Sequence, residues 1–529
     1  MNNEKKQSFV KGAVILAGAG IAVKIIGAFY KIPLGIILGP CGMANFSLAY
    51  NIYALLFVLS TAGVPAAVSK MVSQAEAKGK SADTRRIYRI AFFTFACAGA
   101  VGSLLLFFCA DRLALLMGSA DAAMSVRTIA PAVFFVSASA VSRGYFQGKA
   151  NMYPTAISEV LEASGKLVFG IGLAWIIKRT GKTEAFVSAG AVAGVSAGAF
   201  LSAAYFVFRR DKRQKLPSGE RLRSKRSILR ELASLAIPIT AGAAVISLTN
   251  VIDSALVMNL LAKNGFGVGR AKWLYGAYNY AATLFNLPSA LITTLAVSLI
   301  PSIASAYTGK NFILADKTAN SAMSIAMMVA VPSACGLAAL SYGIVDLLYG
   351  AGITAECIAV SARLLTQLAY AIPLLAIVTV TNAIHQALGH QNVPVVSMAA
   401  GAAVKVISNL ILVGRVDINI YGAAVSTVFC YAAIAVLNIV ALKKYPFIEM
   451  SISKIFIKPA LCGIAVFVTA SRVYICLSSL IDGRISTILS VFAGIAVYIF
   501  CVFCVGAISK EEKKLVFGEK NISKFFNND

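Results

Sequence analysis

Residues 88–110, YRIAFFTFACAGAVGSLLLFFCA, decide the class of fold, because apart from Arg89 they form one uncharged, mostly apolar run. A membrane-spanning helix needs about 20 predominantly apolar residues. Similar runs recur along the 529-residue chain, which is 59% hydrophobic and 13% charged, with a mean hydropathy of +0.80. Soluble domains carry about 25% charged residues. The composition therefore excludes a cytosolic enzyme, a secreted disulfide scaffold and a disordered chain, and it predicts an all-α polytopic membrane protein.

Hydropathy predicts about 14 transmembrane helices, most of them joined by short connections. They are expected at residues 9–31, 44–69, 88–110, 126–146, 154–177, 185–208, 232–261, 274–304, 321–344, 358–388, 394–414, 420–442, 455–475 and 485–508. With the N-terminus inside, most basic residues fall in cytoplasmic segments, as the positive-inside rule requires. We therefore expect a multi-pass protein of the plasma membrane with both termini in the cytoplasm and no cleavable signal peptide.

The two halves of the chain repeat a short pattern. The spacing Y-N-x5-F at residues 50–57 recurs at residues 278–285, an offset of 228. We predict a six-helix lobe at 1–208, a basic cytoplasmic linker at 209–230, a second six-helix lobe at 231–444, two additional helices at 445–509 and a cytoplasmic tail at 510–529. A parallel repeat, with pseudo-symmetric lobes around an axis along the membrane normal, is typical of transporters.

Charged and polar residues inside the predicted spans are candidates for the binding site. A charge at mid-bilayer costs about 2.5–3.5 kcal/mol on insertion scales, so it marks a functional site by default. Lys24 and Lys31 lie in the first span, and the repeat offset places Lys24 next to the position of Asp253. The pair either binds and releases an anionic cargo or forms a structural ion pair. Asn51 and Asn279 are expected to line the same wet cavity.

Lys166 and Lys405 occupy equivalent mid-span positions in the two repeats and are further candidates for cargo binding. Lys166 follows Glu162 and Glu159 at i−4 and i−7, on one face of the expected helix. Opposite charges at i,i+4 attract each other. The sequence thus leaves open whether Lys166 faces cargo or is already neutralised by its own helix.

The remaining charged, histidine and cysteine residues inside the predicted spans are interpreted without a role in binding or catalysis. Arg143 and Arg363 lie near span ends, where a long side chain can extend to the membrane surface. His385 is expected to be a satisfied interfacial residue rather than a proton relay. Cys501 and Cys504 form a C-x-x-C pattern inside a span without a second pair, which argues against a zinc or redox site.

Cationic residues without an acidic cluster favour an anionic cargo, and a lipid-linked pyrophosphate fits best. An inside-negative potential favours outward movement of an anion by about 2.3 kcal/mol per charge per 100 mV. We expect no cofactor, and coupling either to this potential or to a monovalent cation. The formal charge of +26 is interpreted as attraction to membrane lipids rather than binding of nucleic acid. The sequence leaves the oligomeric state open, with a monomer as the expectation.

Four stretches carry a resemblance to a known family. They are VKIIGAFYKIPL (23–34), LSTAGVPAAVSKMVSQ (59–74), RGYFQGKANMYPTAISEVLEASGK (143–166) and INIYGAAVSTVFCY (418–431). The chain resembles the polysaccharide-exporter branch of the multidrug/oligosaccharidyl-lipid/polysaccharide (MOP) flippase superfamily, in particular the stage V sporulation protein B group and the MurJ-type lipid II flippases. The stretches fall in both halves, so the resemblance covers nearly the whole chain.

The resemblance implies a two-lobed, fourteen-helix bacterial transporter that exports a cell-wall precursor linked to undecaprenyl pyrophosphate. It implies that Lys24 replaces a cavity arginine of the first helix and that Lys166 replaces a basic residue of the fifth. One position departs from the pattern: MurJ-type flippases carry an essential arginine shortly before a proline of the eighth helix, and counting back from Pro288 this chain has Thr283. Lipid II, another polyprenyl-linked glycan and a sporulation-specific precursor all remain open as cargo.

We therefore predict a flippase that moves a polyprenyl-pyrophosphate-linked saccharide from the inner to the outer leaflet by alternating access, and not an enzyme. One alternative is a cation-coupled drug exporter of the same superfamily. Another is a glycan polymerase or ligase, which would need a catalytic carboxylate outside the membrane. The acidic residues available for that role stand alone in short loops: Asp111, Asp121, Asp346, Glu356, Asp417 and Asp482.

Overall fold

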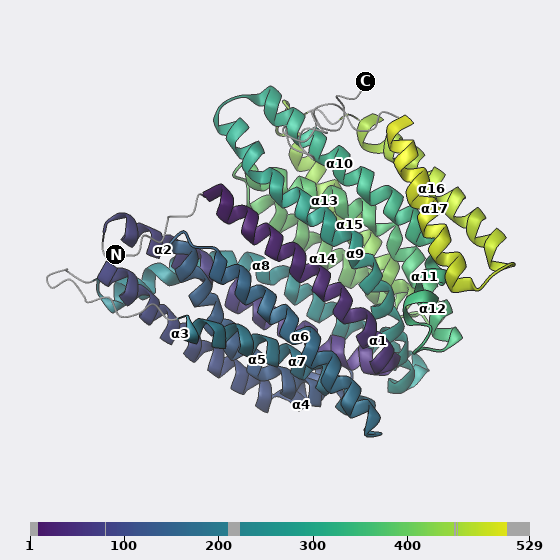
Figure 1. The fold of residues 1–529 in the computed structure, drawn as a ribbon, viewed down its shortest axis with the longest axis horizontal. Coiled ribbons are helices and arrows are strands. Elements are labelled where there is room, and N and C mark those ends of the chain that lie inside the picture. The colour runs from purple at the N-terminus through teal and green to yellow at the C-terminus, as the bar shows by residue number, and fades with distance from the viewer. Residues whose placement is uncertain (1–8, 80, 210–222, 449–450, 452, 505–529) are drawn as a thin grey trace. The chain divides into compact units, whose positions relative to one another are not determined.

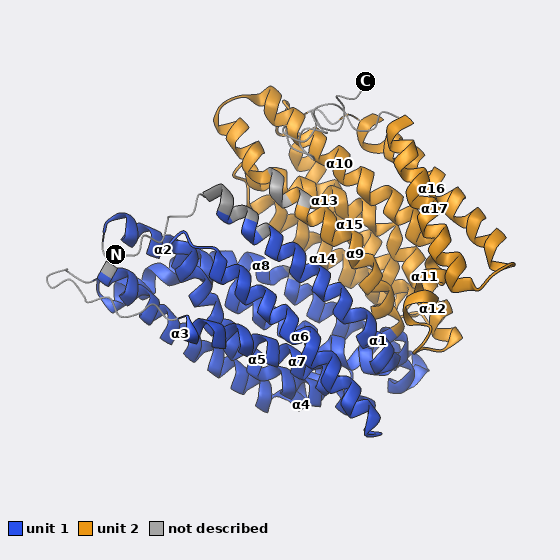
Figure 2. Ribbon diagram, viewed as in Figure 1, with its two compact units in different colours: residues 1–276 blue, residues 277–529 orange. Residues whose placement is uncertain are grey.

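The computed structural model describes residues 9–79, 81–209, 223–448, 451 and 453–504, and in these ranges the chain consists of helices and short connections (Figure 1). The prediction of an all-α membrane protein is confirmed. By its internal contacts the chain divides into two compact units, residues 1–276 and 277–529 (Figure 2).

Unit 1 contains eight helices and the start of a ninth within its described residues. They are α1 (Phe9–Thr61), α2 (Val64–Ala77), α3 (Ser81–Phe108), α4 (Ala110–Leu116), α5 (Ala122–Gly148), α6 (Tyr153–Arg179), α7 (Glu184–Phe208) and α8 (Lys225–Leu261), then a π-helical turn (Ala262–Phe266). Helix α9 (Gly267–Thr308) begins in unit 1 and continues into unit 2. Unit 2 continues with α10 (Phe312–Ala339), α11 (Ser341–Tyr349), α12 (Ala355–Ala369), α13 (Ala371–Ala387), α14 (Asn392–Leu412), α15 (Tyr421–Leu442), a π-helical turn (Ser453–Ile457), α16 (Lys458–Ser478) and α17 (Gly483–Cys504).

The predicted spans coincide with these helices. In the described chain, 11 helical stretches are long and apolar enough to cross a membrane, and the pair α12–α13, bent by 41°, makes a twelfth. Two of the stretches, Gly18–Ala77 and Lys225–Thr294, have 60 and 70 residues. At about 1.5 Å per residue each is far longer than the hydrocarbon core, which is about 30 Å thick. Each of the two contains a pair of predicted spans, so all 14 have a helical counterpart.

Glycines break both long stretches. In α1 the backbone at Gly39 is non-helical, with φ 68° and ψ 177°, and Pro40 follows. Glycine adopts positive φ without a steric penalty, and proline lacks the N–H that would continue the helix. Between α8 and α9 the chain turns at Gly265, where φ is 84°. These breaks separate predicted spans one from two and seven from eight.

Many large apolar side chains lie on the outer faces of the helices. Phe108 on α3 is 76% exposed and Phe208 on α7 is 89% exposed. In water such surfaces would drive aggregation, whereas hydrocarbon solvates them and leaves the helical backbone bonds intact. The exposed faces thus fit a lipid environment.

The compact units and the predicted lobes divide the chain at different places. Helix α8 packs against α1, α2 and α3 and belongs to unit 1, although the sequence repeat assigns it to the second lobe. The predicted lobes are defined by a sequence repeat, whereas the compact units are defined by contacts between residues. The units therefore do not test the lobe boundaries, which stay a prediction. Most of the predicted linker and the whole tail at 510–529 lie outside the described residues.

Helices α6 and α7 approach closely through small residues. A Cβ added at Gly198 would lie 2.3 Å from the Glu162 carbonyl oxygen and 2.9 Å from the Lys166 nitrogen. At Gly194 a Cβ would lie 2.2 Å from Gly170 Cα. Small residues let membrane helices pack with their backbones in contact. This contact fixes the part of α6 that carries Glu162 and Lys166.

A buried polar network joins α13 to α15 in unit 2. Asn438 Nδ2 donates to Thr381 Oγ1 at 3.0 Å and to Asn382 Oδ1 at 2.8 Å. His385 is fully buried, and its Nε2 lies 3.2 Å from the Asn438 carbonyl oxygen. The expectation of a satisfied interfacial residue is therefore wrong, because the ring lies in the interior of the unit and its Nδ1 has no hydrogen-bond partner within the described residues.

Asn438→Ala is expected to lower the stability of the protein, because two buried acceptors on α13 lose their donor. An unsatisfied buried polar group costs about 1–3 kcal/mol. Thermal unfolding of the purified protein, followed by size-exclusion fluorescence, measures the change. Val436→Ala on the same helix is the control, since Val436 is 60% exposed. Equal melting temperatures for the two variants would contradict the importance of the network.

Candidate functional site

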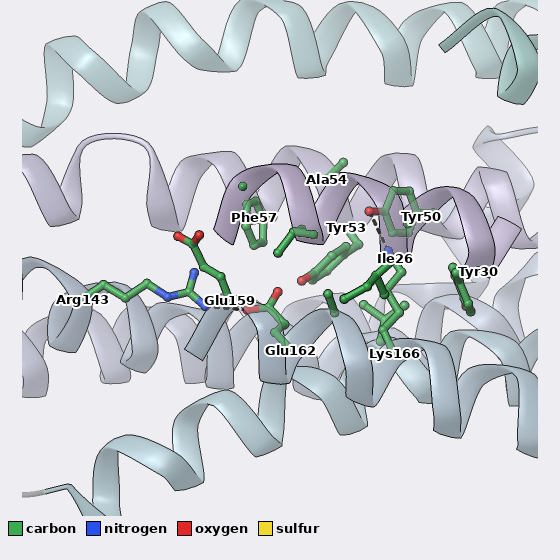
Figure 3. A pocket seen from close by; sticks show the side chains of 15 residues that line it. Ile26, Tyr30, Tyr50, Tyr53, Ala54, Phe57, Arg143, Glu159, Glu162 and Lys166 are labelled. Carbon is green, nitrogen blue, oxygen red and sulfur yellow. Dashed lines mark hydrogen bonds and ion pairs between the residues drawn. The ribbon is translucent and has the colours of Figure 1, made fainter. Parts of the chain in front are cut away.

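Unit 1 contains a partly open cavity of about 310 Å³ between α1, α5, α6 and α7 (Figure 3). It is lined by Gly20, Val23, Ile26, Gly27, Tyr30, Tyr50, Tyr53, Ala54, Phe57, Arg143, Glu159, Glu162, Ala163, Lys166 and Val195. Aromatic side chains from α1 cover one side and charged side chains from α5 and α6 occupy the other. Such a mixture of apolar wall and few charged groups is typical of a ligand-binding cavity.

Lys166 of α6 extends into this cavity among tyrosines. Its Nζ donates to the Tyr50 hydroxyl at 3.0 Å and lies 4.4 Å from the Tyr50 ring centroid and 5.2 Å from that of Tyr30. The Tyr30 hydroxyl is itself bonded to the Ala191 carbonyl oxygen at 3.0 Å. An ammonium near aromatic faces gains cation–π attraction without losing its charge. The geometry thus stabilises a cation that stays available to an anion.

Arg143 of α5 is held firmly at the other end of the cavity. Its residue is 7% exposed, and its Nη2 donates to Glu162 Oε2 at 2.7 Å. Its Nε donates to Ser158 Oγ at 3.0 Å, and its Nη2 also reaches Ser202 Oγ at 3.1 Å. The expectation that Arg143 extends to the membrane surface is therefore wrong, because three side chains from α6 and α7 satisfy its guanidinium in the interior.

The lining contains two basic and two acidic side chains. Glu162 pairs with Arg143, which corrects the idea that Glu162 neutralises Lys166 on its own helix. Glu159 is half-buried, and within the described chain it makes no hydrogen bond or ion pair. The sequence suggested a purely cationic cavity, but the lining also contains two carboxylates. The local charge of the cavity therefore depends on which of these groups pair.

The predicted residues of α1 and α8 are placed differently. Lys31 is half-buried and close enough to Tyr50 and Lys166 for electrostatic interaction with both. Lys24 is exposed and does not belong to the lining, although neighbouring residues of α1 do. Asn51 Nδ2 donates to Ser254 Oγ at 3.1 Å and so joins α1 to α8. Asp253 lies half-buried on α8, and its pairing with Lys24 stays a prediction.

The predicted residues of unit 2 lie outside the lining of this cavity. Asn279 is on α9, where its carbonyl oxygen accepts a hydrogen bond from Thr283 Oγ1 at 2.8 Å. Thr283 is 5% exposed, so the position at which the resemblance implied an arginine is buried here. Lys405 is half-buried on α14, and Arg363 on α12 is exposed.

Unit 2 has a cavity of its own, of about 430 Å³ and mostly apolar. It lies among α9, α10, α11, α16 and α17 and is lined by residues such as Leu287, Leu291 and Val466. The Tyr498 hydroxyl at its edge donates to the Met328 carbonyl oxygen at 3.0 Å. A surface of this composition solvates hydrocarbon better than charge.

Three of the carboxylates considered for catalysis are in ion pairs, and two of them, Asp111 and Asp346, lie on the short helices α4 and α11 rather than in loops. Asp111 pairs with Arg127, and Asp121 pairs with Lys272. Asp346 Oδ2 lies 3.7 Å from Arg484 Nε. Charges that already stabilise one another at the surface are ordinary structural features.

Sequence reasoning missed the aromatic part of the site. Tyr30 and Tyr50 lie in apolar runs, where tyrosine gives little signal by itself. The spacing of Tyr50 and Asn51 indicated a repeat, and Asn51 was expected to line the cavity, whereas the lining contains Tyr50 and not Asn51. One signal was present in the sequence. Lys166 lies in the middle of a span, where its ammonium cannot easily reach water, and this favours polar or aromatic partners on another helix.

Comparisons with known proteins place the chain in a family. Residues 9–307 match the family model described as polysaccharide biosynthesis protein. The chain is 25% identical to the lipid II flippase MurJ of Bacillus subtilis (strain 168), over 95% of this chain and 96% of that protein. It is also 25% identical to the stage V sporulation protein B of the same organism, over 88% of this chain and 89% of that protein.

The fold is shared with a solved flippase structure. A structure of the lipid II flippase MurJ in an inward closed conformation matches 94% of this chain and 100% of its own chain, with a TM-score of 0.73 and 16% identity. The resemblance drawn from the sequence motifs is thereby confirmed. Since the family model covers more than half of the chain, this protein belongs to the polysaccharide biosynthesis protein family.

Proposed function

We propose that the protein is a flippase that moves a polyprenyl-pyrophosphate-linked saccharide from the inner to the outer leaflet by alternating access. The observation that carries the proposal is the family match, extended over nearly the whole chain by the similarity to a lipid II flippase. The name of that flippase describes transport and not enzymatic chemistry. The bacterial plasma membrane is the matching location.

The cavity of unit 1 supports an anionic cargo. Lys166 presents an ammonium whose partners are a hydroxyl and two aromatic rings, and Lys31 adds a second positive charge nearby. A pyrophosphate offers several acceptor oxygens to such donors. The apolar cavity of unit 2 matches the chemistry of a hydrocarbon chain. The membrane potential or a monovalent cation would drive the export of the negative charge.

A different glycan is the second candidate for the cargo. Thr283 stands where lipid II flippases carry an essential arginine, and its hydroxyl is bonded to its own helix. The missing charge favours a related polyprenyl-linked precursor, including one used in sporulation, as the relative named stage V sporulation protein B suggests.

Complementation distinguishes these cargoes. A bacterium depleted of its own lipid II flippase would express this chain, with protein levels checked by immunoblot. We expect growth to be restored if lipid II is carried, and Lys24→Ala, an exposed position, to reduce rescue less than Lys166→Ala. Absence of rescue by well-expressed wild type would exclude lipid II and favour the other glycans. A cation-coupled drug exporter would instead lose activity in Asp253→Asn.

A further inference from the structure

Glu162 lies between two cations, Arg143 of α5 and Lys166 of its own helix (Figure 3). A glutamate four residues before a lysine has a favourable spacing and order for an ion pair on one helix. In the part of the chain that the structure describes, the carboxylate is instead bonded to Arg143 at 2.7 Å. The Lys166 ammonium is bonded to the Tyr50 hydroxyl at 3.0 Å. A contact between helices has displaced the local one.

Arg143 is well placed to hold the carboxylate. The Arg143 side chain is 9% exposed, and Ser158 of α6 and Ser202 of α7 fix its guanidinium. A buried guanidinium stays charged and donates in a fixed geometry. Without Arg143, Glu162 would be a largely buried carboxylate without its cation, four residues from an ammonium. The Glu162 carboxylate would then be expected to form an ion pair with the Lys166 ammonium.

We propose that Arg143 is a positioning residue: by holding Glu162, it keeps the Lys166 ammonium available for the anionic group of the cargo. The identity of that anion rests on the proposed function. The pairing of Arg143 with Glu162 does not depend on the proposed function. Two other charged groups face the same space. Glu159 is seven residues from Lys166, about 10.5 Å along the helix axis, compared with about 6 Å for Glu162. Lys31 repels Lys166 and cannot neutralise it.

The state of the Lys166 amine is measurable directly. The full-length protein in detergent would be treated with an amine-reactive reagent, and modification of Lys166 followed by mass spectrometry with and without inorganic pyrophosphate. In the wild type we expect modification, and protection by pyrophosphate. In Arg143→Gln we expect modification to be about tenfold slower, the effect of one ion pair of ordinary strength. An ammonium held by a carboxylate keeps its proton and reacts slowly.

Second-site variants separate positioning from support of the fold. Arg143→Gln combined with Glu162→Gln should restore both the modification rate and transport, because no carboxylate is left to pair with Lys166. Arg143→Gln combined with Glu159→Gln is the matched control and should stay slow. Arg143→Lys, which keeps a cation beside Glu162, should resemble the wild type. The modification rate of the inserted protein separates the two roles, because a purely structural role changes the amount of folded protein and its transport but not the reactivity of the Lys166 amine.

Three results would overturn the inference. Unchanged modification in Arg143→Gln would mean that Glu162 does not move to Lys166. A folded double variant that stays slow would mean that Arg143 acts by another route. If Arg143→Gln does not accumulate, the double variant decides alone, and wild-type modification there supports the inference. Absence of pyrophosphate protection in the wild type, with the pattern of variants intact, would contradict the anionic cargo and leave the pairing standing.

Discussion

Lys166→Ala is expected to abolish export of the cargo that the wild type carries. The alanine removes the ammonium that donates to Tyr50 and lies near the rings of Tyr50 and Tyr30. Hydrogen bonds to charged groups contribute about 1.5–3 kcal/mol, or about a tenfold to hundredfold change in binding, and more where water is scarce. Complementation and flipping in proteoliposomes both measure the effect.

The conservative variants make the result specific. Lys166→Arg keeps the charge and should retain part of the transport, although a planar guanidinium fits the tyrosines differently. Tyr50→Phe keeps the ring and removes only the hydroxyl, so it should cost less than the loss of the amine. Wild-type transport by a well-expressed Lys166→Ala would contradict a role of this lysine in binding the cargo.

Gly198→Ala is expected to be strongly disruptive in unit 1, because the glycine lies against the backbone of α6. The new Cβ would lie 2.3 Å from the Glu162 carbonyl oxygen, so the backbones of α6 and α7 must separate. Overpacking of this kind costs about 1–3 kcal/mol. The separation would also displace Glu162 and Lys166, so transport should fall together with the melting temperature.

The matched control lies on α6. A Cβ added at Gly172 would meet no atom within 4 Å, so Gly172→Ala adds a methyl group and removes a flexible residue without a clash. We expect it to leave the melting temperature unchanged or to raise it slightly. If both variants behaved alike, helix propensity rather than close packing would control stability at these positions.

The helices were predictable from the sequence because each span carries its own signal. An apolar run of sufficient length must satisfy its backbone hydrogen bonds within itself in lipid. The breaks at Gly39 and Gly265 fall in the gaps between predicted spans, at 32–43 and 262–273, although the sequence did not single out these glycines. The division into compact units was not visible, because the side of α8 that packs against α1 depends on contacts between distant residues.

The site was predictable only in part. Lys166 was found because a charge inside a span is costly and therefore conspicuous. Its partner Tyr50 lies 116 positions away in the sequence, and Ser202 lies 59 positions from Arg143. Local spacing favoured a pair between Glu162 and Lys166, and a guanidinium from the preceding helix prevents it. Sequence distance does not reveal such competition between a local and a tertiary partner.

The pair of Arg143 and Glu162 also has a consequence for biosynthesis. The two charges lie on consecutive helices, α5 and α6, joined by a short turn. Each charge alone would oppose entry into the bilayer by about 2.5–3.5 kcal/mol. If the two helices leave the translocon as a hairpin, each charge enters lipid already neutralised by the other. A single substitution at either position would then reduce the yield of inserted protein, and the double neutral variant would recover it.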